Sequence, residues 1–146
     1  MEYQTFVRAV EDRTGLSTAE EVDDATGATL VTFSERIPDE EARDLASQLP
    51  DEVGSYLTAA DGSESFGFDE FVTRVLERES VTEMDERDAA TEHAQAVVAV
   101  LLDAVTSEES DDVLSYLTRD YERLFEGVDP EEVWGPGWRE RLGEAG

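Results

Sequence analysis

Residues 3–10 read YQTFVRAV, and residues 68–75 read FDEFVTRV. In the first stretch the apolar side chains are Tyr3, Phe6 and two valines, at positions i, i+3, i+4 and i+7. This spacing places them on one face of an amphipathic helix. The second stretch has phenylalanine or valine at all four positions. The sequence therefore predicts two equivalent helices, which start 65 residues apart.

The similarity continues beyond these helices, at an offset of 68 residues after a three-residue insertion, so that Leu30 corresponds to Val98. The pattern describes one four-helix unit that is written twice. A unit of roughly 60 residues buries little of its own surface. We therefore expect an all-α fold in which two tandem four-helix units pack as one compact helical bundle, followed by a short C-terminal helical tail. The expected parts of this single domain are unit one at residues 1–58, a linker at 59–66, unit two at 67–126 and the tail at 127–146.

Polar residues mark the expected helix starts. Ser17 followed by Glu20 resembles a capping box, and Asp39 and Ser107 are expected to cap later helices. Gly27 lies inside a predicted helix, where the missing side chain allows a neighbour to come close. The segment over about residues 86–105 is the most apolar in the chain. A wide apolar face is typical of a helix with neighbours on two sides, so we expect this helix at the centre.

The chain carries 38 acidic and 11 basic residues, for a net charge of -27, and every basic residue is arginine. Such a charge opposes folding in dilute buffer, whereas salt at 1 M shortens the Debye length to about 3 Å. The composition resembles that of cytosolic proteins from salt-accumulating haloarchaea. We therefore expect a cytoplasmic, halophilic protein whose acidic surface carries many solvent cations. A protein that mimics nucleic acid would carry a similar negative charge and is an alternative explanation. Disorder would be a third explanation, but the regular spacing of apolar residues disfavours it.

The composition also excludes several classes of function. Nucleic-acid binding needs a basic footprint, and no cluster of three basic residues occurs. No segment reaches the roughly 18 apolar residues of a membrane span, and the N-terminal residues lack the pattern of a signal peptide. Because the chain has no cysteine, disulfides and thiolate chemistry are excluded. We expect no nucleic-acid partner, no membrane contact and no cofactor.

Three features of the chain resemble the family called domain of unknown function 2267. They are the opening Tyr3-x-x-Phe6-x-x-x-Val10, the segment Glu41-Ala-Arg-Asp-Leu45-x-x-Gln-Leu49-Pro50 and the repetition of the whole pattern. The similarity extends over about residues 1–126. It implies a small all-helical prokaryotic protein, and it assigns no catalytic residue or cofactor to any position. The second copy departs from the pattern, because Leu117-Thr118 stands where the first copy has leucine and proline.

His93 is the only histidine. A metal site on one helix needs a second ligand three or four residues away, and those positions hold Ala89, Ala90, Ala96 and Val97. We therefore expect a hydrogen-bonded histidine in the core or between helices. General-base chemistry at this residue would require a carboxylate from another helix.

The linker and the start of the next helix resemble the second part of a calcium-binding EF-hand loop. In that alignment Glu70 is the bidentate ligand, and Asp61 and Ser63 supply further oxygen atoms. However, Ala59 stands at the first ligand position and Glu64 stands where the loop requires glycine. We therefore expect no true EF-hand, and weak cation binding here stays open.

Adjacent acidic residues occur throughout the chain, as at Glu40-Glu41 and Glu108-Glu109. Both pairs lie in the first turn of a predicted helix, where negative charge stabilises the helix dipole. A catalytic carboxylate needs burial or a close partner to shift its pKa. We interpret most of these pairs as solvated helix faces.

The tail contains both tryptophans, Trp134 and Trp138, on either side of Gly-Pro-Gly. This tripeptide interrupts a helix and makes a turn. We favour docking of the tryptophans on the core, and the alternative is an exposed aromatic hook for a partner.

These observations favour a non-catalytic halophilic helical protein that acts in interaction or scaffolding. Its partner would be another protein, or a second copy that binds through a wide apolar helix face. The alternative is a small enzyme or ligand-binding protein with a site between the two units, which would use His93 and carboxylates from other helices.

Overall fold

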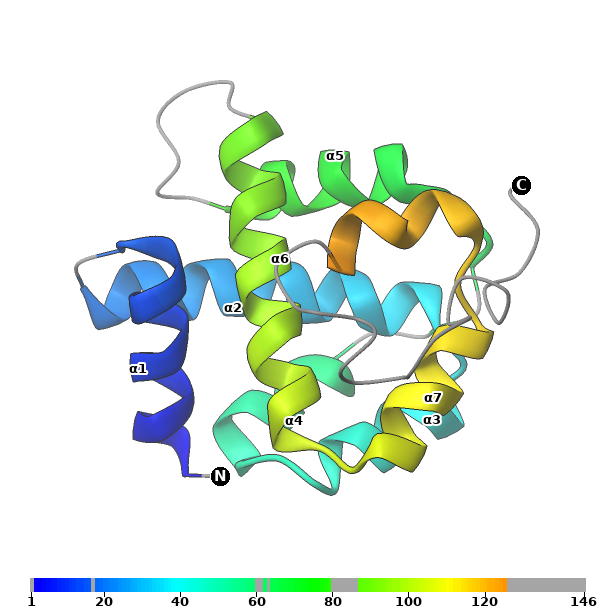
Figure 1. The fold of residues 1–146 in the computed structure, drawn as a ribbon, viewed down its shortest axis with the longest axis horizontal. Coiled ribbons are helices and arrows are strands. Elements are labelled where there is room, and N and C mark those ends of the chain that lie inside the picture. The colour runs from blue at the N-terminus through cyan, green and yellow to red at the C-terminus, as the bar shows by residue number, and fades with distance from the viewer. Residues whose placement is uncertain (1, 17, 60–61, 63, 80–86, 126–146) are drawn as a thin grey trace.

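The computed structural model describes residues 2–16, 18–59, 62, 64–79 and 87–125. In this part of the chain every regular element is helical, as predicted, and no strand occurs. Figure 1 shows the helices packed as one compact bundle. The described ranges contain seven α-helices and one 3-10 helix, namely α1 (Tyr3–Thr14), α2 (Ala19–Arg36), α3 (Asp39–Ala46), α4 (Asp51–Leu57), α5 (Phe68–Arg78), α6 (Arg87–Ala104), α7 (Ser107–Ser115) and η1 (Arg119–Phe125).

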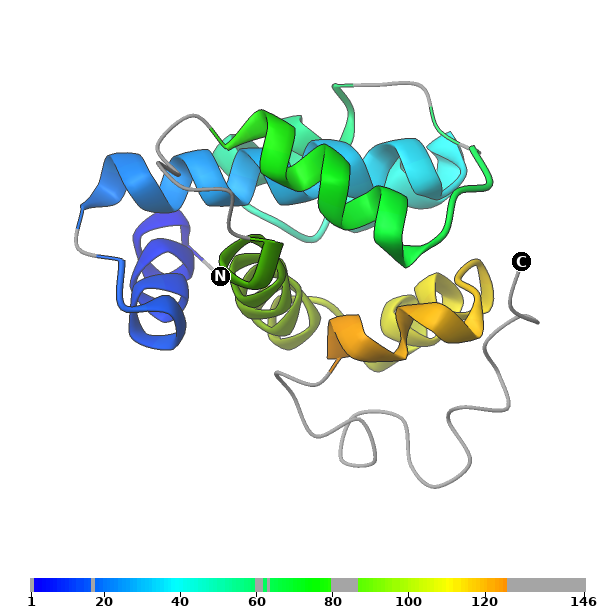
Figure 2. The same ribbon diagram turned by 90° about the horizontal axis from the view of Figure 1, so that it is seen from above.

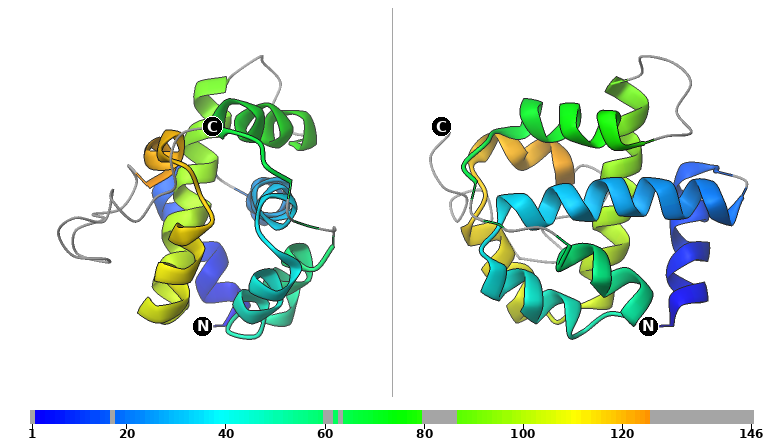
Figure 3. Two further views of the ribbon diagram at one scale, coloured as in Figure 1. Left: turned by 90° about the vertical axis from the view of Figure 1, so that its right-hand side faces the viewer. Right: turned by 180° about the vertical axis from the view of Figure 1, so that it is seen from behind.

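The two longest helices, α2 and α6, cross each other in the middle of the molecule (Figure 1). The short helix α5 lies along α2, and α1 lies beside α6 (Figure 2). On its other side α2 contacts α4, which packs against α3 (Figure 3). Each long helix therefore contacts helices from both ends of the chain.

Helix α6 lies at the centre, as the sequence predicts. It contacts α1, α2, α5 and η1. Its wide apolar face is consequently covered inside the molecule, where the buried residues are Ala90, Ala94, Ala96, Val97, Val98, Ala99, Val100, Leu101 and Leu102. The predicted close approach at Gly27 is made by α4, because a Cβ atom at that position would lie 3.0 Å from the ring of Tyr56.

A cluster of aromatic rings joins α2, α5 and η1. The Phe71 ring packs edge-to-face against Phe33 and Tyr121, with centroid distances of 6.2 and 5.7 Å. The Phe68 ring packs in the same way against Tyr121, at 5.8 Å. All four side chains are buried. Such pairs contribute about 0.5–1.5 kcal/mol beyond the burial of their area. The cluster therefore connects residues that lie far apart in the sequence.

Part of the segment between α4 and α5 is held against the end of α2. The Gly62 amide donates to the Asp39 carboxylate at 2.6 Å, and the Glu64 amide donates to the carbonyl of Glu35 at 2.9 Å. The Phe66 carbonyl accepts from the guanidinium of an α2 arginine and from a tyrosine hydroxyl of η1. These bonds fix the path that the chain takes from α4 to α5.

The predicted capping residues are wrong by one position. The N-cap of α2 is Thr18, whose hydroxyl accepts from the amide of Glu21 at 3.1 Å. The N-cap of α7 is Thr106, and the N-cap of α3 is Pro38. Asp39 instead lies within α3, where its carboxylate holds the connecting segment. Thr18 and Thr106 each stand next to a serine with the same capping hydroxyl, so local preference does not separate the two positions.

None of the helices in the described ranges is both long enough and apolar enough to cross a membrane.

The tyrosine hydroxyl of η1 provides a test of this packing. Tyr121 is fully buried and its hydroxyl donates to the Phe66 carbonyl at 2.8 Å. We expect Tyr121→Phe to lower the free energy of unfolding by about 1 kcal/mol, because one buried hydrogen bond is lost. The measurement is urea denaturation in molar KCl. The matched control is Tyr116→Phe, whose side chain is 41% exposed and whose loss should change stability very little. An equal effect of the two variants would contradict the packing described here.

Candidate functional site

Two acidic side chains meet where α3 lies against α7 (Figure 1). Glu41 is the third residue of α3, and Glu109 is the third residue of α7. Glu41 is only 5% exposed. Oxygen atoms of Glu41, Glu109 and Asp44 all lie within 4.8 Å of one another. We call these three residues the α3–α7 carboxylate cluster.

The cluster concentrates negative charge in a poorly solvated place. One oxygen of Glu41 and one oxygen of Glu109 are buried without a hydrogen-bond partner in the described part of the chain. The pKa of Glu41 is raised to about 8, first by burial, then by the hydrogen bond and charge of Glu109, and finally by the charges of Asp112 and Asp44. Two close carboxylates cannot both ionise easily. The arrangement can therefore hold a proton or a cation.

The sequence does not predict this cluster, because its acidic pairs are typical of solvated helix faces. That interpretation fits Glu40 and Glu108, which are exposed. It is wrong for Glu41, which faces α7. A signal was present in the spacing, since Glu41 lies four residues before the apolar Leu45 and therefore shares its helix face.

His93 forms an ion pair that joins two helices. Its Nδ1 atom lies 2.6 Å from a carboxylate oxygen of Glu79, the C-cap residue that directly follows α5. The side chain of Glu79 is 1% exposed, and that of His93 is 15% exposed. The hydrogen bond with Glu79 raises the pKa of His93 against the opposing effect of burial, and Glu92 and Glu21 raise it further. This carboxylate gives the histidine a fixed orientation, which sequence analysis had no signal to identify.

Of the remaining candidates from the sequence, only Glu70 lies within the described residues. Glu70 lies on α5, and its carboxylate accepts from Nε of Arg74 at 3.0 Å. Asp61 and Ser63, the other suggested calcium ligands, lie outside the described residues, as do Trp134 and Trp138 of the tail.

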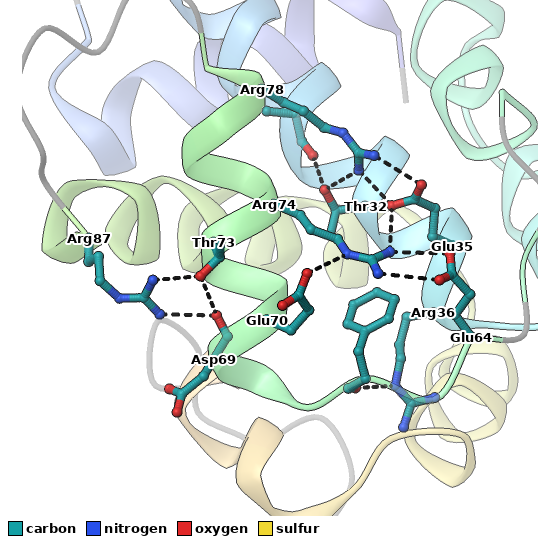
Figure 4. A network of polar contacts seen from close by, with 12 residues as sticks. Thr32, Glu35, Arg36, Glu64, Asp69, Glu70, Thr73, Arg74, Arg78 and Arg87 are labelled. Carbon is teal, nitrogen blue, oxygen red and sulfur yellow. Dashed lines mark hydrogen bonds and ion pairs between the residues drawn. The ribbon is translucent and has the colours of Figure 1, made fainter.

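Arginines of α5 form a polar network with α2 (Figure 4). Arg78 donates two hydrogen bonds to the Glu35 carboxylate, at 2.7 and 2.9 Å, and a third to the buried Thr32 hydroxyl. Arg74 donates to Glu35 and to both carboxylate oxygens of Glu64. These bonds lower the pKa of Glu35, chiefly through Arg78. The network therefore fastens α5 and the connecting segment to α2.

An open groove of about 440 Å³ lies over α2 and α4. Its lining includes small and apolar groups and the ring of Tyr56. The pKa of Tyr56 is raised by burial and then by the charges of Asp23 and Asp24. The hydroxyl of Tyr3 donates to Asp23, and this bond is the main reason that the pKa of Tyr3 is raised to about 12. The residues lining the groove are Glu20, Asp23, Asp24, Gly27, Ala28, Val31, Tyr56 and Arg78. Because the Arg78 side chain is already bonded to Glu35, the groove presents mainly negative charge.

The histidine pair predicts a pH dependence of stability. The folded-state pKa of His93 lies above the ordinary value of about 6.5. The contribution of the protonated histidine to the free energy of unfolding is therefore complete below that pH, and it is lost as the pH rises through the folded-state pKa. We expect the difference in unfolding free energy between the wild-type protein and the less stable His93→Gln variant to be larger at low pH than at high pH. Urea denaturation between about pH 6 and pH 9 measures this difference.

Two further variants identify the partner. Glu79→Gln should remove the pH dependence of that difference, because it removes the carboxylate bonded to His93. Glu92→Gln removes an equal charge next to His93. This variant should preserve most of the pH dependence, since Glu92 contributes less than Glu79 to the pKa of His93. A difference that does not vary with pH in the wild-type background would refute the interpretation of the pair.

Comparison with known proteins places the chain without assigning an activity. No curated protein matches it significantly. The sequence profile of the uncharacterized conserved protein family DUF2267 matches residues 3–124, which includes the helices that contribute the carboxylate cluster, the histidine pair and the groove. The chain therefore belongs to the DUF2267 family.

Proposed function

We propose that this protein is a non-catalytic helical interaction module, built from two copies of a four-helix unit, that works in a salt-rich cytoplasm. The observation that carries the proposal is the open acidic groove over α2 and α4, which suits a basic segment of a protein partner. The duplication, the partner and the cellular location are parts of this proposal, and each has its own support.

The order of the helices supports the duplication. The helices of the first unit start at residues 3, 19, 39 and 51, and those of the second start at 68, 87, 107 and 119. The last three offsets are all 68, as the sequence repeat predicts. The packing is also reciprocal, because α5 contacts α2 while α1 contacts α6. A fused pair of units that exchange their first helices would produce this arrangement.

The charge supports a salt-rich setting. A net charge of -27 on 146 residues produces strong self-repulsion. The arginine network between α5 and α2 neutralises only a local part of it. Molar salt screens the rest, since the Debye length there is about 3 Å.

The shape of the groove favours a protein partner over a small substrate. A small-molecule site usually encloses most of its ligand, and this groove is open. Its lining includes the carboxylates of Glu20, Asp23 and Asp24 together with Val31 and the ring of Tyr56. A lysine or arginine of a partner could place its alkyl stem against Val31 or Tyr56 and its charge near the carboxylates. In contrast, the apolar face of α6 is covered within the molecule, so self-association would have to use another surface.

The experiment is affinity capture from cells in native salt, followed by binding measurements on the purified partner. We expect Glu20→Gln/Asp24→Asn to weaken the complex about tenfold or more, because a lost charge contact with a bonded cation costs about 1.5–3 kcal/mol. The matched control is Glu40→Gln/Glu108→Gln, which removes the same charge from exposed positions on α3 and α7. It should bind like the wild type. Failure to capture a partner, or equal weakening by both variants, would count against the proposal.

A second candidate is a small enzyme or ligand-binding protein with its site between the two units. The α3–α7 carboxylate cluster favours the ligand-binding form of this idea, because Glu41 comes from one proposed unit and Glu109 from the other. The histidine pair favours it less, since Glu79 and His93 both come from the second proposed unit.

A further inference from the structure

The α3–α7 carboxylate cluster has a property that an ordinary acidic surface lacks. Glu41 is 95% buried, yet one of its oxygen atoms has no hydrogen-bond partner in the described part of the chain, and the same is true of one oxygen of Glu109. One carboxylate oxygen from each of Glu41, Glu109 and Asp44 lies within 4.8 Å of the others. A buried carboxylate without a partner is costly. A cation, or a group that donates a hydrogen bond to these oxygens, would remove that cost.

The chemistry of the cluster suits a hard cation. Its ligands are carboxylate oxygens, which suit the hard cations Ca²⁺, Mg²⁺ and Mn²⁺ better than the softer metals. Three carboxylates can supply up to six oxygens, and the exposed side of Asp44 leaves room for water. Calcium takes six to eight oxygens in flexible geometry, whereas magnesium usually takes one or two carboxylates and keeps its water. The donor set therefore fits calcium best.

We propose that Glu41, Asp44 and Glu109 bind a divalent cation, with calcium as the preferred ion, between α3 and α7. The ion replaces the repulsion between Glu41 and Glu109 with two attractions, so it fastens the two proposed four-helix units together at this contact. Asp112, whose charge already acts on Glu41, adds to the negative potential at the site. This inference goes beyond the proposed partner-binding function and does not depend on the groove over α2 and α4.

The alternative occupant of the cluster is a proton. A proton shared by Glu41 and Glu109 would also relieve their repulsion, and it would be lost as the pH rises through about 8. The carboxylates of Asp44 and Asp112 and the ring of Tyr116 face this pair from the two helices. The two occupants differ in their response to calcium, because only a cation site is stabilised by the added ion.

The test uses the full chain in molar KCl, which suppresses non-specific condensation of Ca²⁺ on the acidic surface. Isothermal titration with CaCl₂ should show one site per chain. Glu41→Gln/Glu109→Gln should weaken binding at least about tenfold. The matched control, Glu40→Gln/Glu108→Gln, changes the same charge in the same helix turns and should bind like the wild type. Equal weakening by both variants would show only diffuse ion binding and would overturn the proposal.

Stability measurements separate the cation from the proton. Glu41 is protonated more readily in the folded state, so without calcium the unfolding free energy should fall as the pH rises from its ordinary pKa of 4.5 through about 8. We expect calcium to restore stability at the upper end of this range in the wild type, and not in Glu41→Gln. A fall with pH that calcium does not change would assign the cluster to a shared proton and would overturn the cation site. The neutral variant itself should fold well, because it removes the repulsion.

Discussion

The crossing of α2 and α6 is the contact on which the rest of the structure depends. Both helices are long, and both bury apolar side chains over most of their length. Each leaves a groove on either side that a shorter helix fills, α5 and α4 beside α2, and α1 and η1 beside α6. Because α5 packs on α2 and α1 packs on α6, neither half of the chain completes its core alone. The helices of both halves therefore share one hydrophobic core.

The polar contacts are arranged around this crossing. The network of Arg74 and Arg78 lies on the face where α5 meets α2, and the ion pair of His93 lies where α6 meets the end of α5. In these places a basic group accompanies the carboxylates. At the contact of α3 and α7 the described residues provide no basic partner for Glu41 or Glu109. This imbalance distinguishes the carboxylate cluster from the other acidic contacts and makes it the place where a counter-ion matters most.

The elements that could be predicted from the sequence are those with strong apolar periodicity. The spacing of Tyr3, Phe6 and Val10 gives α1 its buried face, and the apolar run in residues 86–105 predicts the central position of α6. The caps were wrong by one residue because threonine, serine and aspartate near a helix start have similar local preferences. The cluster was missed for a related reason, since a glutamate in a first turn fits a solvated helix end as well as a buried contact.

The sequence by itself determined the helical class, the approximate helix bounds, the apolar face of each helix and the large negative charge. These follow from periodicity, from glycine and proline, and from composition, all of which act within a few residues of the chain. Only the tertiary structure decided which carboxylates share a space and which side chain each arginine meets. Glu41 and Glu109 are 68 residues apart in the chain, and their closeness depends on how two helices pack. Local sequence carries no direct record of that distance, because a side chain acquires its burial and its partners only when the helices assemble.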